Sequence, residues 1–321
     1  MAAYIIRRII LIIPTLLLVS IIVFFGIRVV PGSAIDLVMS RMDTAPLHGR
    51  EDEMGAEIAK QLGMDKPIII QYGKWIGDIL FRGDLGTMLW QKVPITEELK
   101  YRLPITFELG ILALITGLLI AFPIGIYSAI RQETISDYIG RSFAILCIAI
   151  PGFWLGTMMM VIPPYYFGWS PPVLHIPFRE NPSQNLLQFI IPAVILGMAS
   201  AGINMRMTRT MMLEVLRQDY IRTAWSKGLR ERIIIIRHGL KNALIPVVTI
   251  VGLQIPVLIG GTVIIETIFN LPGMGRMLVD AIFQRDYPTL SGVTFLVAAF
   301  IMLSNLLVDI TYSWLDPRIR Y

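Results

Sequence analysis

The sequence predicts an all-α, polytopic membrane protein with six transmembrane helices, and two observations lead to this fold class. Of the 321 residues, 55% are hydrophobic and only 16% are charged, which is too apolar and too weakly charged for an ordinary soluble domain. Several apolar stretches also reach the roughly 20 residues that an α-helix needs to cross the hydrocarbon layer. Because lipid cannot satisfy backbone polar groups, such stretches must cross as helices.

Six apolar segments have this length, and they cover residues 9–30, 104–130, 142–167, 186–205, 243–265 and 290–313. The first follows Arg7 and Arg8 and is longer than the roughly 7–15 residues of a signal-peptide core, so we expect an uncleaved anchor with a cytoplasmic N-terminus. Six crossings then place residues 131–141, 206–242 and 314–321 inside the cell. The outside segments are 31–103, 168–185 and 266–289.

The distribution of basic residues supports this orientation. Residues 206–242 hold nine Lys or Arg against three Asp or Glu, a net charge of +6, and the C-terminal tail adds Arg318 and Arg320. An excess of basic residues on the cytoplasmic side is the rule for membrane proteins. We therefore expect a multi-pass protein of the cell membrane with both termini inside. These charges beside the membrane suit lipid headgroups or a protein partner, so nucleic-acid binding is not expected.

The cytoplasmic segment 206–242 is longer than most connections between two spans. From Thr210 to Lys227 its apolar residues recur at helical spacing, Gly228 then interrupts the pattern, and a second helical stretch runs from about Glu231 to Ala243. The segment therefore predicts a helix, a glycine hinge and another helix. Periodicity alone also fits an amphipathic helix lying on the lipid surface.

Two runs of residues, one inside this segment and one that begins in it and continues to Pro246, resemble a known family. They are Asp219-Tyr-Ile-Arg-Thr-Ala-Trp-Ser-Lys-Gly-Leu229 and His238-Gly-Leu-Lys-Asn-Ala-Leu-Ile-Pro246. They are similar to the cytoplasmic loop of the dipeptide, oligopeptide and nickel permeases of ATP-binding-cassette (ABC) importers. Further motifs in the family's order are Arg102-Leu-Pro-Ile-Thr-Phe-Glu-Leu109, Pro151-Gly-Phe-Trp154, Glu266-Thr-Ile-Phe269, Leu271-Pro-Gly-Met-Gly275, Arg285-Asp-Tyr-Pro288 and Asp309 to Arg318.

The resemblance implies a type I ABC importer permease fold. It implies two parts, residues 1–101 with the first span and an extracytoplasmic segment, and residues 102–315 as a five-helix core that contains the coupling loop 206–242. In the family this loop docks into a groove on an ATPase subunit. The coupling residues are then Asp219, Tyr220, Arg222, Thr223, Ala224, Lys227 and Gly228.

The resemblance also implies partners: a second permease, two ATP-binding subunits and an extracytoplasmic substrate-binding protein. The sequence has no Gly-rich phosphate-binding loop with its Lys, so we expect a non-catalytic subunit whose partner hydrolyses ATP. No catalytic set, metal site or cofactor is expected. Relatives carry dipeptides, longer peptides, nickel chelates or oligosaccharides, and this sequence does not choose among them.

Asp309 stands near the inner end of the sixth predicted span, where an unpaired charge is costly. We expect Arg206 or Arg209, at the inner end of the fourth span, to pair with it. Two other functions remain open. A self-contained secondary transporter lacks support from inverted halves or clustered buried charges, and an intramembrane enzyme lacks an assembled nucleophile and base.

Overall fold

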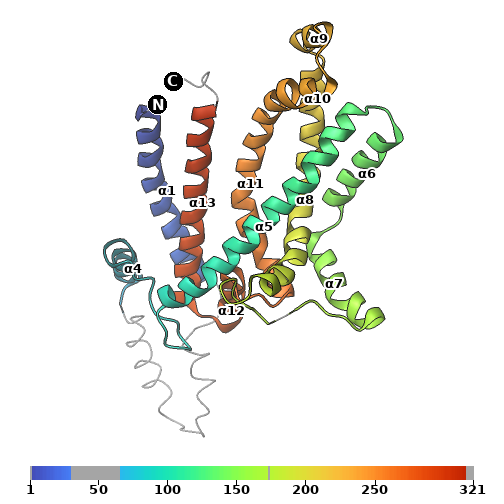
Figure 1. The fold of residues 1–321 in the computed structure, drawn as a ribbon. Coiled ribbons are helices and arrows are strands. Elements are labelled where there is room, and N and C mark those ends of the chain that lie inside the picture. The colour runs from blue at the N-terminus through green and yellow to red at the C-terminus, as the bar shows by residue number, and fades with distance from the viewer. Residues whose placement is uncertain (1, 30–65, 173, 316–321) are drawn as a thin grey trace, which may run out of the picture. The chain divides into compact units, whose positions relative to one another are not determined.

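The computed structural model describes residues 2–29, 66–172 and 174–315, and nearly all of them lie in helices (Figure 1). The only β-structure among the described residues is an isolated bridge between Thr87 and Pro94. The all-α prediction is therefore confirmed. The helices are α1 (Ala2–Val29), α4 (Ile68–Arg82), α5 (Ile95–Ile130), α6 (Ile135–Ala149), α7 (Gly152–Phe167), α8 (Pro182–Leu216), α9 (Asp219–Ser226), α10 (Glu231–Ile233), the π-helix η1 (Ile234–Leu240), α11 (Lys241–Ile268), α12 (Met274–Gln284) and α13 (Tyr287–Leu315).

Five helices among the described residues are long and apolar enough to cross a membrane, and α6 with α7 forms a sixth candidate span that is bent by 90°. The sequence predicts one continuous helix over 142–167, and the structure corrects this. Ile150 lies between the two helices in an extended conformation, with φ −86° and ψ 122°. It precedes Pro151, whose ring disfavours the helical conformation of the residue before it, so the helix ends there.

The fourth span is also longer than predicted. Helix α8 begins at Pro182, where the Asn181 side chain accepts a hydrogen bond from the backbone N–H of Gln184, a typical N-terminal cap. The helix continues past residue 205 to Leu216. The stretch 210–227, predicted as one helix, is therefore divided between α8 and α9. The break is at Arg217 and Gln218, and Gln218 has an extended ψ of 149°.

The chain divides into two compact units. One contains residues 104–275 and the segment from Leu303 onward, and the other contains residues 2–103 and 276–302. The boundary predicted between residues 101 and 102 falls inside α5, which runs through it without a break. The predicted division into residues 1–101 and 102–315 stays a prediction.

In the first unit, close helix contacts depend on small residues. A Cβ atom added to Gly202 of α8 would lie 2.6 Å from the carbonyl oxygen of Ala144 and 2.7 Å from Ile148 Cγ1, both on α6. Around this contact Cys147 and Met205 are almost fully buried. Small residues let membrane helices approach until their backbones touch, and the resulting packing holds them together.

A buried carboxylate organises the chain that follows α11. Glu266 is fully buried and accepts a hydrogen bond of 2.7 Å from Thr106 Oγ1, which itself accepts one of 2.8 Å from the N–H of Met274. The backbone at Gly273 passes so close to this carboxylate that a Cβ atom there would overlap it. The glycine at position 273 of the motif thus has a structural reason, because a residue with a Cβ atom would not fit there.

The second unit is organised around aromatic rings and one carboxylate. Phe24, Tyr72 and Trp75 contact one another with ring centroids 5.3–6.3 Å apart. Asp286 is almost fully buried, and its side chain accepts hydrogen bonds from the N–H groups of Leu89 at 2.9 Å and Thr289 at 3.1 Å. Asp286 therefore holds the loop after α4 against the start of α13.

Candidate functional site

The segment 206–242 contains the end of α8, all of α9, a turn, α10 and η1, and Figure 1 shows α9 beyond the end of α8. Helix α9 ends at Ser226, and Gly228 follows in the left-handed conformation with φ +71°. Apart from its two chain neighbours, no residue has an atom within 4 Å of a Cβ placed on Gly228. A larger residue would therefore meet only the backbone strain of this conformation, about 1–2 kcal/mol for a residue with a Cβ.

Helix α9 is held by a small apolar cluster, which we call the α9 seat. Its buried members are Ile221 and Ala224 of α9 and Ile234 of η1, and Leu216 and Leu229 pack against them. The helix is only 8 residues long, and a helix of that length is marginal in water without tertiary contacts. The seat therefore fixes α9 to the end of α8 and to η1.

A polar contact also holds α9 in place. Asn242 Nδ2 donates to the Tyr220 hydroxyl at 2.8 Å and to the carbonyl oxygen of His238 at 3.2 Å. Tyr220 and Asn242 belong to α9 and α11, so this bond joins the first helix of the segment to the start of the next span. The two motif runs of the sequence, 219–229 and 238–246, are in contact in the structure.

The remaining predicted residues lie on the exposed face of α9 and beyond its end. Asp219 and Arg222 form an ion pair of 3.2 Å with side chains 94% and 75% exposed, so it contributes little stability. Thr223 and Lys227 are also exposed. We call this surface the α9 face, and it comprises Asp219, Tyr220, Arg222, Thr223, Trp225 and Lys227.

Ala224 and Trp225 are neighbours in this helix, but one side chain is buried and the other is exposed. Ala224 is 7% exposed and belongs to the α9 seat, so its side chain packs against other residues of the chain and is not part of the α9 face. Trp225 is 50% exposed and was not among the predicted residues. An aromatic residue on the polar side of an amphipathic helix was the signal that could have identified it, because exposed Trp and Tyr are enriched at protein interfaces.

Arg209 and Arg206, predicted near Asp309, lie on α8. Arg209 forms a two-pronged ion pair with Asp137 of α6, with Nε to Oδ1 and Nη2 to Oδ2 both at 2.7 Å. Asp137 was not singled out from the sequence. The side chain of Asp309 lies outside the described residues, so its pairing stays a prediction.

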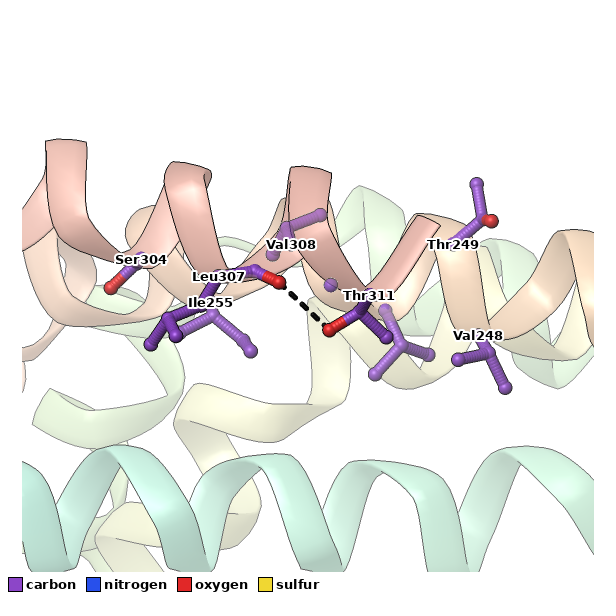
Figure 2. Close-up of a pocket in the computed structure, with 9 residues that line it drawn as sticks. Val248, Thr249, Ile255, Ser304, Leu307, Val308 and Thr311 are labelled. Atoms are coloured by element: carbon purple, nitrogen blue, oxygen red, sulfur yellow. Dashed lines mark hydrogen bonds between the residues drawn. The ribbon is translucent and has the colours of Figure 1, made fainter. Parts of the chain in front are cut away.

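A cavity of about 270 Å³ lies between α11 and α13. Figure 2 shows its lining, which includes Val248, Ile255 and Leu307. The hydroxyl of Thr311 donates to the carbonyl oxygen of Leu307 at 2.7 Å, so it is already satisfied within α13. The described lining residues carry no charge, and this surface suits contact with lipid or with another helix rather than with an ion.

Comparison with known proteins gives family matches that cover both ends of the chain. Residues 121–321 match the family described as the binding-protein-dependent transport system inner membrane component. Residues 1–110 match the corresponding N-terminal domain of these membrane components. The two matches leave only residues 111–120 of α5 between them.

Three curated relatives are similar along their whole length. The oligopeptide transport system permease protein AppB of Bacillus subtilis is 39% identical, with both chains covered completely. The glutathione transport system permease protein GsiC of Pectobacterium atrosepticum is 38% identical, again with 100% of both chains. The dipeptide transport system permease protein DppB of Escherichia coli K12 is 35% identical over all of this chain and 99% of its own.

Two solved structures share the fold. The MetNI methionine ABC transporter, in an inward-facing conformation, has a chain that matches with a TM-score of 0.55 and 17% identity, over 68% of this chain and 96% of that one. An amino acid ABC transporter matches with a TM-score of 0.54 and 13% identity, over 68% and 94%. At these identities the likeness concerns the fold alone, and it agrees with the predicted type I importer permease fold.

Proposed function

The chain belongs to the family of binding-protein-dependent transport system inner membrane components, and on that premise we propose that it is a permease subunit of an ATP-driven peptide importer. The curated relatives named for oligopeptide, glutathione and dipeptide transport support peptides as the substrate class. The chain would form the membrane pathway with a second permease, and a binding protein outside the cell would deliver the peptide.

The observation that carries this proposal is the construction of α9. A helix of 8 residues is fixed on its apolar side by the α9 seat, and it presents Tyr220 and Trp225 to the surroundings at 43% and 50% exposure. A rigid, exposed, partly aromatic face is the kind of surface that fits a groove on a partner protein. We assign the α9 face to docking on an ATP-binding subunit.

In this function the residues of the segment transmit movement and do not catalyse. When two ATP-binding subunits close and open on nucleotide, a docked α9 would follow them and carry its movement to α8 and α11, which flank the segment. Such a change is a rigid-body switch between two states that nucleotide binding biases. ATP hydrolysis is then the work of the partner subunits.

Reconstitution tests the proposed function. The chain should be placed in proteoliposomes with the second permease, the ATP-binding subunits and the binding protein of its system, and uptake of labelled di-, tri- and pentapeptides measured. We expect uptake only when ATP and the binding protein are both present. Uptake by this chain alone, driven by an ion gradient without ATP, would contradict the proposal and support a secondary transporter.

The proposed orientation gives a separate prediction. In a Cys147→Ala background, which removes the only native thiol, Glu180→Cys and Phe283→Cys should react with an impermeant thiol reagent added outside intact cells. Arg217→Cys should react only after the cells are opened. All three positions are accessible in the chain, since Glu180 and Arg217 are exposed and Phe283 is 80% exposed. Outside labelling of the cysteine at 217 would invert the assigned topology.

A further inference from the structure

The Asp137–Arg209 ion pair belongs to a group of contacts outside both the α9 seat and the α9 face. Asp137 is in the first turn of α6 and is fully buried. Besides the two bonds from Arg209, its carboxylate accepts the Ser128 hydroxyl and, at 3.0 Å, the N–H of Glu133. We call Asp137, Ser128, Glu133 and Arg209 the Asp137 junction.

The Asp137 junction connects four parts of the chain through one side chain. Ser128 lies in the last turn of α5, Glu133 in the turn between α5 and α6, Asp137 in α6, and Arg209 in α8. Glu133 has a φ of +64°, a conformation that residues other than glycine rarely adopt, and its N–H is held by the carboxylate. Each carboxylate oxygen of Asp137 accepts two hydrogen bonds, so the α5–α6 turn is held in one geometry.

The junction stands close to the α9 seat along α8. Leu216, which packs against the seat, ends the same helix that carries Arg209, and the two residues lie about two helical turns apart. Arg217, directly after α8, donates to Gln132 Oε1 in the α5–α6 turn at 3.4 Å. A short set of contacts therefore leads from α9 through the end of α8 to the α5–α6 turn.

We propose that Asp137 is a positioning residue for coupling, which makes α5 and α6 move together with α8 when the ATPase displaces α9. The inference rests on the proposed function and extends it, because α5 and α6 do not flank the coupling segment. A buried ion pair often contributes little or nothing to net stability compared with apolar residues of similar size. The defined geometry of the junction, rather than stability, is then its contribution.

The chemistry of the pair separates positioning from a purely structural role. Removing one partner leaves the other charge buried and unpaired, which destabilises a protein, whereas replacing both partners with apolar residues is often neutral. Asp137→Ala should therefore lower the amount of assembled complex. Asp137→Ala combined with Arg209→Met should restore that amount, yet it leaves the α5–α6 turn without its connection to α8.

The test uses the full reconstituted importer and the labelled peptide that it takes up. We expect the double variant to assemble with the ATP-binding subunits and to hydrolyse ATP within twofold of the unchanged complex, while peptide taken up per ATP hydrolysed falls at least tenfold. Arg141→Gln is the matched control. The Arg141 side chain is 45% exposed, and its Nη1 lies 4.0 Å from Asp137 Oδ2, so it contacts the same carboxylate only weakly. This variant should keep the normal ratio.

Two outcomes would overturn the inference. One is a normal ratio of uptake to ATP hydrolysis in the double variant, and the other is a double variant that fails to accumulate, which would assign the pair to folding. Ala224→Trp in the same preparation tests the proposed function independently. If Ala224→Trp abolishes uptake while the double variant transports normally, only the role of Asp137 fails. If Ala224→Trp itself transports normally, the coupling role of the segment fails.

Discussion

Replacing Ala224 with tryptophan is expected to abolish peptide uptake while the chain still inserts in the membrane at a near-normal level. Ala224 is 7% exposed and packs with Ile221 and Ile234 in the α9 seat. An indole ring cannot fit there without separating α9 from the end of α8 and from η1. Overpacking of a filled site typically costs about 1–3 kcal/mol, and a helix of 8 residues has little stability of its own to oppose this.

The measurement is the amount of ATP-binding subunit that co-purifies with the variant, together with ATP-dependent uptake. We expect both to fall at least tenfold, because the α9 face would no longer be presented in one orientation. Ala224→Ser is the matched control, since it changes the volume of the side chain very little and should retain most of the uptake. A helix that merely lies on the lipid surface predicts the opposite result, because added aromatic area would strengthen its membrane contact.

A substitution at an exposed position distinguishes the α9 seat from the α9 face. Trp225 is 50% exposed and does not belong to the α9 seat. Its removal in Trp225→Ala leaves the seat intact, so loss of the ATP-binding subunit from this variant would locate the contact on the α9 face. Full uptake with Ala224→Trp would contradict the coupling function of this segment. Full co-purification and full uptake with Trp225→Ala would contradict the docking role of the α9 face.

Gly202→Ala is expected to destabilise the packing of the membrane-embedded helices strongly. The added methyl group would lie 2.6 Å from the carbonyl oxygen of Ala144, and a backbone atom cannot move aside as the end of a flexible side chain can. Helices α6 and α8 would have to separate along their contact. We expect a loss of about 3 kcal/mol in the free energy of unfolding, at the upper end of the usual cost of overpacking.

Thermal unfolding of the purified protein in detergent measures this effect. The matched control is Gly260→Ala, because Gly260 is also inside a long helix, α11, but beyond its chain neighbours and the adjacent helix backbone no atom lies within 4 Å of a Cβ placed there. Alanine has the higher helix propensity of the two residues, so the control should be neutral or slightly more stable. Equal melting temperatures for the two variants would contradict the close α6–α8 contact.

The positions of the spans could be predicted from the sequence because hydrophobic length is a local property. A run of about 20 apolar residues indicates a membrane span whatever its neighbours are, and the six predicted segments correspond to the five long helices and the bent α6–α7 pair. The motifs around Gly228 were equally local, since a left-handed turn is encoded by glycine itself. The bend at Ile150 was also encoded, in Pro151, although the apolar run concealed it.

The parts that could not be predicted depend on contacts between distant residues. That Ala224 lies against its own chain and Trp225 does not follows from where Ile234 is placed, and periodicity does not show which side of a short helix is covered. Asp137 and Arg209 are 72 positions apart, so nothing in the sequence near either residue announces the other.

The sequence by itself thus determined the class of protein, the positions of its apolar segments and the segment that carries the family motifs. These depend on composition, on hydrophobic length and on short patterns. Only the tertiary structure decided that α9 is seated on Leu216 and Ile234 and that Asp137 joins α5, α6 and α8. The physical reason is that a buried charge or a short helix is stable only through partners that the fold brings to it from elsewhere in the chain.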